Sequence, residues 1–162
     1  MEKKVLFLCS QNAARSQMAE AILNIKGRGR FAAYSAGLNP ASQIDSFAIE
    51  AMKQDDIDIS CKVPKSLKEF ENVKFDFIIT LCDKAINECP SYSSDTITAH
   101  WGITDPINFK GADEEKIKFY IKVKKEIMTR INVFLSLPIE KLDKLTLETK
   151  LQESEALLKL SQ

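Results

Sequence analysis

A short apolar run near the N-terminus, followed at once by a helical pattern, constrains the fold of this chain more than any other feature. Residues 5–8 are all apolar and lie between polar residues, which is typical of a strand covered on both faces. After Ser16 the apolar residues recur at helical spacing, at Met18, Ala21, Ile22 and Ile25. A buried strand that leads directly into a helix predicts an α/β fold.

The rest of the chain continues this alternation. Further strands are expected at residues 31–35, 74–81 and 96–99, and helices at residues 45–54, 65–71 and 114–135. This order predicts a three-layer α/β/α domain with a four-stranded parallel sheet. Pro138 interrupts the last pattern, so residues 1–137 are expected to form the main domain and residues 138–162 a C-terminal tail with a helix at 148–160.

The composition excludes several classes of function. Lys plus Arg and Asp plus Glu both total 23, so no net charge attracts the chain to nucleic acid or to an anionic membrane. No apolar run approaches the ~20 residues that span a bilayer, and the N-terminus does not resemble a signal peptide. We therefore expect a cytoplasmic monomer whose four cysteines are reduced and available for redox chemistry.

Cys9 lies where the first strand ends, and residues 10–15 connect it to the following helix. The free N–H groups and the dipole at a helix N-terminus bind a tetrahedral anion, and the same field favours a nucleophilic thiolate. Arg15 adds a planar charged group that can bind two oxyanion oxygens. Because ligands of parallel sheets bind beyond the carboxyl ends of the strands, the sequence predicts an oxyanion-attacking cysteine here. The alternative is a cysteine that only packs in the core.

Cys82 and Cys89 follow the third expected strand and stand seven positions apart. In a helix they would share a face with their Cα atoms about 10 Å apart, at a rise of ~1.5 Å per residue. A disulfide needs Cα atoms within ~7 Å, so bridging them requires this segment to unwind. Two packed core cysteines are one alternative. A zinc site is another, weakly supported because the chain has one histidine.

Four separated motifs resemble a known family. Residues 8–20, Leu-Cys-Ser-Gln-Asn-Ala-Ala-Arg-Ser-Gln-Met-Ala-Glu, resemble the anion loop of low-molecular-weight protein tyrosine phosphatases and of their relatives, the arsenate reductases. Residues 35–37, Ser-Ala-Gly, match the turn after the family's second strand. The remaining motifs resemble the reductase branch of the family specifically. They are Thr80-Leu-Cys82-Asp-Lys-Ala-Ile-Asn-Glu-Cys89-Pro90, His100-Trp101-Gly102 and Asp105-Pro106. The resemblance covers residues 3–135 and implies a phosphatase-like catalytic domain.

The resemblance implies a thioredoxin-coupled arsenate reductase with no resident cofactor. Cys9 would attack arsenate, the Ser16 hydroxyl would lower the pKa of the Cys9 thiol, and Asp105 would be the general acid. The oxyanion would be bound by the loop residues Ser10, Gln11, Asn12, Ala13, Ala14 and Arg15. Cys82 would then attack Cys9 and release arsenite. Cys89 would resolve the new disulfide, which thioredoxin or a small thiol would reduce.

Several positions depart from the family pattern or stay open. Ala14 stands where the phosphatases usually have a second cysteine, and Ile107-Asn108 replaces their tyrosine pair. Both differences argue against a phosphotyrosine enzyme. A phosphatase acting through a phosphocysteine nevertheless remains an alternative, as does a non-catalytic thiol sensor. Cys61 is expected to take no part in the reaction. His100 and Trp101 are expected to pack against the loop that carries Asp105, the acid loop.

Some thioredoxin-linked reductases bind potassium beside the anion loop. Asn12, Glu20 and Ser35 match those ligands, but Lys65 stands where an aspartate ligand is expected. We therefore expect an ammonium group in place of the cation, and no required metal.

Overall fold

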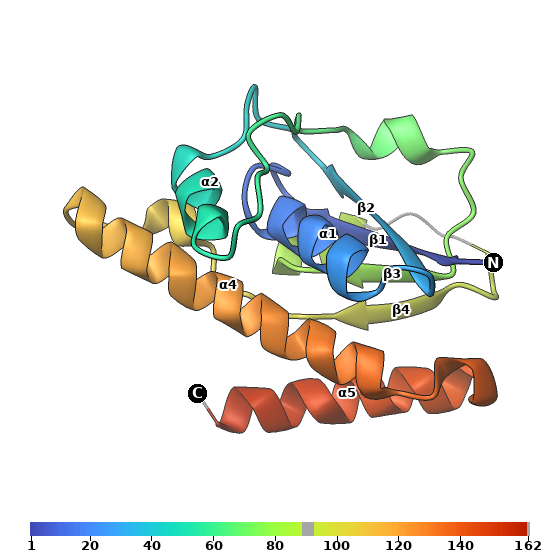
Figure 1. Cartoon of the computed structure of the whole chain (residues 1–162). Coiled ribbons are helices and arrows are strands. Elements are labelled where there is room, and N and C mark those ends of the chain that lie inside the picture. The colour runs from blue at the N-terminus through green and yellow to red at the C-terminus, as the bar shows by residue number, and fades with distance from the viewer. Residues whose placement is uncertain (89–92, 162) are drawn as a thin grey trace.

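The computed structural model describes residues 1–88 and 93–161, and its centre is a parallel sheet of four strands (Figure 1). The strands are β1 (Lys3–Cys9), β2 (Phe31–Gly37), β3 (Phe77–Thr80) and β4 (Ile97–His100). They lie in the order β2-β1-β3-β4, and all pairs are parallel. The predicted α/β fold with a four-stranded parallel sheet is confirmed.

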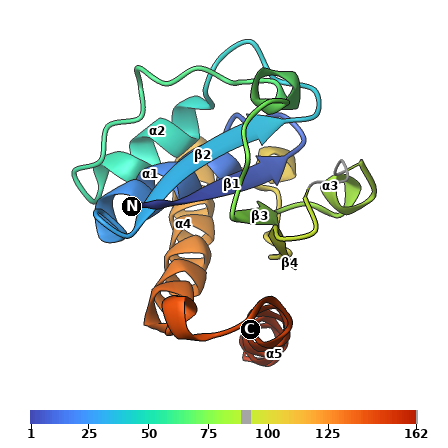
Figure 2. The same cartoon turned by 90° about the vertical axis from the view of Figure 1, so that its right-hand side faces the viewer.

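Helices cover both faces of the sheet, as Figure 2 shows. One face carries α1 (Arg15–Lys26), α2 (Ser46–Lys53) and α4 (Asp113–Ser136). The other face carries α3 (Asp83–Glu88) and the 3-10 turn η1 (Leu67–Phe70). Two further short turns are η2 (Pro106–Asn108) and η3 (Ile139–Lys141), and the chain ends in α5 (Lys144–Leu160).

The first strand explains why the apolar run is unbroken. Val5 and Phe7 pack in the larger cluster under α1, α2 and α4, whereas Leu6 and Leu8 pack in the smaller cluster with Ala85 of α3. All four strand residues are fully buried. Alternate residues of a strand point to opposite faces, so a strand covered on both sides needs apolar residues at every position.

The strand register brings the predicted cysteines to one edge of the sheet. Leu8 of β1 pairs with Thr80 of β3, so Cys9 and Cys82 both lie just beyond this pair. Gly37 at the end of β2 pairs with Cys9 from the other side. Because parallel strands end at the same edge, residues distant in sequence meet at the entrance to the first helix.

Some boundaries differ from the sequence expectations, for local reasons. Residues 65–71 contain a 3-10 turn instead of a longer helix, closed by a capping box between Ser66 and Glu69. The last helix begins at Lys144, four residues before the expected start, because the Asp143 carboxylate accepts a hydrogen bond from Thr146 N at 2.8 Å. β3 begins at Phe77, since the Asp76 carboxylate already binds Lys4 N at 2.8 Å.

The last helix, α5, lies along the edge strand β4 and against α4 (Figures 1 and 2). Leu147 and Leu151 are buried, and Glu155 forms a bidentate ion pair with the buried Arg130 at 2.7 and 3.0 Å. The Glu148 carboxylate accepts a hydrogen bond from the backbone N–H of Thr98 in β4 at 3.3 Å.

The opposite edge of the sheet is bound by α1. The Asn24 amide accepts from the backbone N–H of Ala33 in β2 at 2.8 Å and donates to the carbonyl of the same residue at 3.1 Å. Within the described ranges, no helix is both long and apolar enough to cross a membrane.

Candidate active site

The loop after Cys9 is held by a row of backbone hydrogen bonds from the segment that follows β2. The carbonyls of Cys9, Ser10, Gln11 and Ala13 accept from the N–H groups of Leu38, Asn39, Ala41 and Asp45 at 2.8–3.1 Å. In a trans peptide the N–H of the next residue points away from the carbonyl. These contacts therefore turn the N–H groups of residues 10, 11, 12 and 14 to the opposite side, which suits an anion cradle.

Gly37 lets this segment approach the loop. A Cβ atom at Gly37 would lie 2.8 Å from the carbonyl oxygen of Ser10 and 3.0 Å from the backbone nitrogen of Asn12. Both are backbone atoms that cannot move aside without breaking the row of hydrogen bonds. The glycine is required for close approach, not for an unusual backbone conformation.

Asn12 holds the loop in a left-handed turn, with φ of 53°. Its Oδ1 accepts from Gln17 Nε2 and from the backbone N–H of Lys65, both at 2.8 Å. Its Nδ2 donates to Ser16 Oγ at 2.7 Å. These three contacts fix the side chain completely, so they stabilise a conformation that is costly for most residues.

Cys9 is buried, with 3% of its surface exposed. Its Sγ lies 2.8 Å from Ser16 Oγ and accepts from the backbone N–H of Asn12 at 3.3 Å. Burial raises the pKa of the Cys9 thiol, while the hydroxyl of Ser16, the charge of Arg15 and the backbone of Asn12 and Ser16 act in the opposite direction. These contacts do favour the thiolate, as expected for the loop. In the closed site, however, the loss of solvent has the larger effect, so the pKa of Cys9 is raised overall.

Removing the Ser16 hydroxyl should move the reactivity of Cys9 to higher pH. The thiolate is the reactive form, and Ser16→Ala removes the largest of the contacts that lower the pKa of this buried thiol. The measurement is the rate of iodoacetamide labelling of each cysteine from pH 6 to 10, followed by peptide mass spectrometry. The exposed Cys61 is an internal control whose profile should not change. An unchanged Cys9 profile would contradict the assignment.

Arg15 is held by two carbonyls and by the candidate acid. Its NH1 group donates to the backbone oxygens of Leu81 at 3.2 Å and Ile103 at 3.0 Å. Its NH2 group lies 3.2 Å from Asp105 Oδ2. The two carbonyls were not predicted, because backbone acceptors have no sequence signature. They align the guanidinium beside the loop and leave it paired with the acid.

Asp105 closes the site in this state. Its Oδ1 accepts from the backbone N–H of Ile107 at 3.1 Å, which caps η2, and its Oδ2 faces Arg15. The cavity between Cys9, the loop, Asp105 and Ile107 has a volume of about 10 Å³, which is room for about one water molecule. A tetrahedral oxyanion must therefore displace the Asp105 carboxylate and replace it on Arg15.

Cys82 lies close to the nucleophile loop. Its Sγ is 3.3 Å from the hydroxyl of Ser10, the residue after Cys9. The structure thus brings together Cys9, Arg15, Ser16, Asp105 and Cys82, which are far apart in sequence. Cys89 lies outside the described residues.

The two aromatic residues of the His-Trp-Gly motif have different surroundings. Trp101 is buried and packs on Phe7 and Phe134, with ring centroids 5.8 and 6.4 Å apart. His100 instead contacts α3: its Nε2 lies 3.2 Å from Asp83 Oδ1, and its Nδ1 lies 2.8 Å from Thr80 Oγ1. The expectation that His100 packs against the acid loop is therefore wrong, because its strand position directs it to the α3 face.

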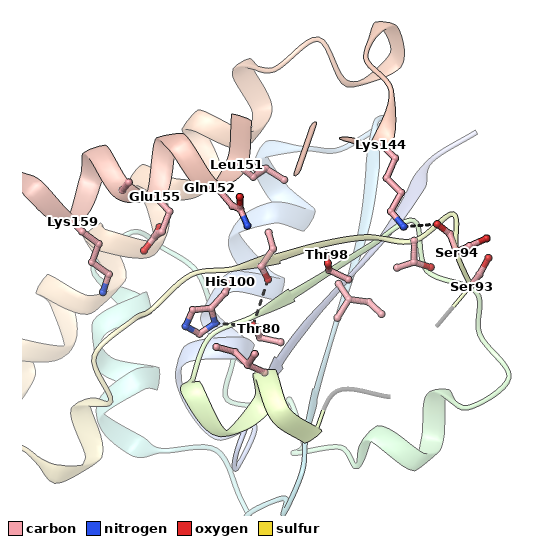
Figure 3. Close-up of a pocket in the computed structure, with 15 residues that line it drawn as sticks. Thr80, Ser93, Ser94, Thr98, His100, Lys144, Leu151, Gln152, Glu155 and Lys159 are labelled. Atoms are coloured by element: carbon pink, nitrogen blue, oxygen red, sulfur yellow. Dashed lines mark hydrogen bonds between the residues drawn. The ribbon is translucent and has the colours of Figure 1, made fainter. Parts of the chain in front are cut away.

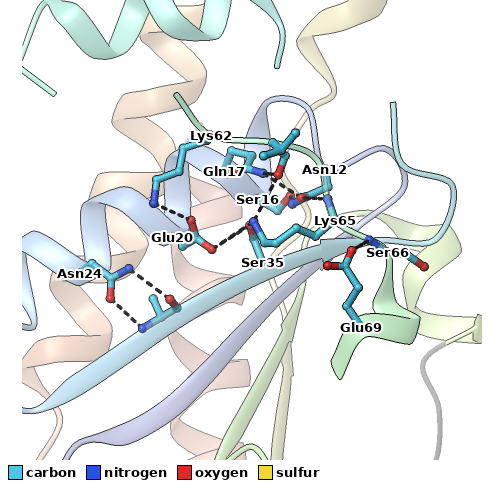
Figure 4. Close-up of polar contacts among 12 residues, drawn as sticks. Asn12, Ser16, Gln17, Glu20, Asn24, Ser35, Lys62, Lys65, Ser66 and Glu69 are labelled. Atoms are coloured by element: carbon cyan, nitrogen blue, oxygen red, sulfur yellow. Dashed lines mark hydrogen bonds and ion pairs between the residues drawn. The ribbon is translucent and has the colours of Figure 1, made fainter. Parts of the chain in front are cut away.

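The positions that match potassium ligands are occupied by hydrogen bonds and ammonium groups (Figure 4). The nearly buried Glu20 carboxylate accepts from Ser35 Oγ at 3.2 Å and lies 3.4 Å from Lys62 Nζ and 3.6 Å from Lys65 Nζ. Among the described side chains one buried oxygen, Gln17 Oε1, has no partner. One free oxygen does not supply the several oxygens that a hard cation needs, so this site does not fit potassium.

We expect activity in potassium and sodium buffers of equal ionic strength to agree within about twofold, because the two ammonium groups already neutralise Glu20. The measurement is the initial rate with oxyanion substrate in each salt. Strong stimulation by potassium alone would contradict this reading.

A much larger cavity lies elsewhere, between β4, α3 and α5 (Figure 3). Its volume is about 720 Å³, and its walls include His100, Glu155 and Lys159. Glu155 is paired with Arg130, and Lys159 donates to the carbonyl of Gly102. The nucleophile and Arg15 do not line this cavity, so size alone does not identify the reactive site.

The sequence is similar to a phosphatase family and to several reductases. A family model described as "Low molecular weight phosphotyrosine protein phosphatase" matches residues 4–147. An arsenate reductase of Halalkalibacterium halodurans is 38% identical over 135 residues, covering 83% of this chain and 96% of the relative. A glutaredoxin arsenate reductase of Synechocystis sp. is 31% identical over 129 residues, covering 80% and 93%.

A solved structure described as an arsenate reductase in the phosphate binding state matches with a TM-score of 0.68 and 30% identity. The match covers 80% of this chain and 94% of that chain. The family model ends within the first turn of α5, so most of this helix lies beyond it.

Proposed function

Because the chain belongs to the low molecular weight phosphotyrosine protein phosphatase family, we propose that it uses the Cys9 site to reduce arsenate to arsenite. The observation that carries this proposal is the second thiol. Cys82 Sγ lies 3.3 Å from the hydroxyl of Ser10, the residue that follows the nucleophile in the chain. Hydrolysis of a phosphate ester needs no second thiol here, whereas reduction needs two electrons from a thiol pair.

The first step forms a covalent adduct. Arsenate binds to the loop N–H groups and to Arg15, and so displaces the Asp105 carboxylate from the guanidinium. The displaced Asp105 carboxylate takes the proton of the Cys9 thiol, and the resulting thiolate attacks arsenic, forming an S–As bond. An As–OH bond breaks, and its oxygen leaves as water with the proton that Asp105 has accepted.

The second step transfers the electrons. The Cys82 thiolate attacks the sulfur of Cys9, and a Cys9–Cys82 disulfide forms while the S–As bond breaks. Arsenic keeps the electron pair of this bond and leaves as arsenite. Cys89 then attacks Cys82, which frees Cys9 and leaves a Cys82–Cys89 disulfide. A dithiol protein of the thioredoxin or glutaredoxin class reduces this disulfide.

The test is arsenate-dependent NADPH oxidation by fully reduced protein. One reaction contains thioredoxin and thioredoxin reductase, and a second contains glutaredoxin, glutathione and glutathione reductase. We expect sustained turnover with thioredoxin. Turnover only in the reaction with glutaredoxin would support the assignment as an arsenate reductase but show that its partner is glutaredoxin.

The variant Cys82→Ser separates reduction from hydrolysis, and Cys61→Ser is its matched control. Cys82→Ser should lose sustained arsenite production, whereas Cys61→Ser should match the wild type because Cys61 is an exposed thiol. If no arsenite forms while aryl phosphates are hydrolysed, and Cys82→Ser leaves that hydrolysis unchanged, the protein is a phosphatase. Cys9, Arg15 and Asp105 alone would support that reaction.

A further inference from the structure

Two consecutive residues of α4 each contact a different loop of the active site. Phe119 stacks on Phe109, with ring centroids 4.6 Å apart and ring planes 11° apart. The hydroxyl of the next residue, Tyr120, donates a hydrogen bond to Asp45 Oδ2. Successive side chains of a helix point about 100° apart, so one helix can reach both loops from one place.

The hydrogen bond from Tyr120 connects α4 to the nucleophile loop through Asp45. Asp45 donates from its backbone N–H to the carbonyl of Ala13 at 2.9 Å, the last bond in the row that orients the loop. Its Oδ1 also caps α2 by accepting from Phe47 N at 2.9 Å. Asp45 is thus fixed by α2 and α4 together, and through its backbone it fixes the loop.

The stacking of Phe119 connects α4 to the acid loop through Phe109. Phe109 is the residue that ends η2, the turn that begins at the cap formed by Asp105. Its N–H donates to the carbonyl of Pro106 at 3.1 Å. The stacked ring therefore connects α4 to the turn that carries the candidate acid.

We propose that Phe119 and Tyr120 are positioning residues, which together hold the acid loop and the nucleophile loop at their working separation. The inference rests on oxyanion chemistry at Cys9, but it does not depend on whether the reaction is reduction or hydrolysis. Neither residue touches the oxyanion, and each acts through another residue.

The ionisation of Tyr120 is compatible with this role. Burial, the Asp45 carboxylate and the Asp105 carboxylate all raise the pKa of the Tyr120 phenol well above its ordinary value. The hydroxyl therefore remains a hydrogen-bond donor across the working pH range.

The first test removes only the hydroxyl. Tyr120→Phe keeps the ring that packs on Phe47, 5.6 Å between centroids, but releases Asp45. The measurement is protection of Cys9 from iodoacetamide by inorganic phosphate, below the unfolding temperature of each variant. We expect the half-protecting phosphate concentration to rise about tenfold, since a hydrogen bond to a charged group is lost.

Two further variants make this result specific. Asp45→Ser keeps the helix cap but does not reach Tyr120, so it should match Tyr120→Phe, and the double variant should be no worse than either single one. Tyr34→Phe is the matched control, because Tyr34 packs with Phe70 and Phe75 on the opposite face of the sheet. Its phosphate protection should equal that of the wild type.

The second test addresses the acid loop. Phe119→Leu should leave phosphate protection within about twofold, yet lower the single-turnover rate of arsenite release about tenfold, because the acid is less well placed. Phe70→Leu is the control for loss of an aromatic ring elsewhere. If arsenate is not reduced, the proposed function fails, and the same comparison is made with p-nitrophenyl phosphate hydrolysis.

The opposing outcomes are distinct. Unchanged phosphate protection in Tyr120→Phe, or an unchanged rate in Phe119→Leu, overturns the inference. So does equal loss in the test variants and their controls, which would indicate general destabilisation. If neither arsenate nor the ester reacts, the part of the inference that concerns Phe119 fails, and phosphate protection still decides the part that concerns Tyr120.

Discussion

Replacing Cys9 by serine should abolish turnover while leaving the anion site intact. Serine is similar in size and can keep the contacts with Ser16 and the Asn12 N–H, but a neutral hydroxyl does not form the S–As bond or a disulfide. We expect the rate of arsenite formation to fall by roughly 10⁴-fold or more, as for other covalent nucleophiles. The measurement is arsenite released per protein, with phosphate binding followed by calorimetry.

The matched control is Cys61→Ser, which changes the same atoms at an exposed position and should retain full activity. Residual turnover of Cys9→Ser above one-hundredth of the wild-type rate would show that another residue is the nucleophile. Loss of phosphate binding together with activity would show that the substitution has disturbed the loop.

Replacing Arg15 by lysine should have the second largest effect. The guanidinium donates to two carbonyls and still faces Asp105, whereas one ammonium group does not match this planar arrangement. We expect kcat/KM for arsenate to fall about 100- to 1000-fold, the effect of removing a preorganised oxyanion donor. The thermal unfolding midpoint should also fall, since the carbonyls of Leu81 and Ile103 lose a buried donor.

The control for this variant is Arg28→Lys, because Arg28 is exposed on the turn after α1. It should leave kcat/KM and the unfolding midpoint unchanged. A loss of less than about fivefold in Arg15→Lys would mean that the loop N–H groups alone bind the oxyanion, and the role assigned to the guanidinium would be withdrawn.

The sequence predicted those parts of the molecule that depend on local pattern. Residues 5–8 are fully buried between two helical layers, which is why their apolar run has no gaps and why the strand could be recognised. The position of Cys9 followed from the rule that ligands of parallel sheets bind beyond the carboxyl ends of the strands, and Cys82 was expected only to follow a strand. The start of α5 was missed because Asp143, a strong helix cap, precedes a segment with mixed apolar spacing.

The parts that could not be predicted depend on contacts between distant residues. Tyr120 binds Asp45 across 75 positions, and Arg15 binds backbone oxygens 66 and 88 positions away. Nothing in the local sequence distinguishes Leu81 or Ile103 from other apolar residues. The net rise in the pKa of the Cys9 thiol could also not be predicted, because the burial of this thiol depends on how Asp105 closes the site.

The two edge strands of the sheet, β2 and β4, affect how the protein behaves in concentrated solution. An edge strand offers unpaired backbone groups to any other extended chain, and so it can start aggregation. In β2 the Asn24 side chain occupies both backbone groups of Ala33, and in β4 the Glu148 carboxylate occupies the N–H of Thr98. In β2 one position therefore offers a second molecule neither of its backbone groups, and in β4 one position offers it no free N–H. On the β4 side this protection is provided by the helix that extends past the family match.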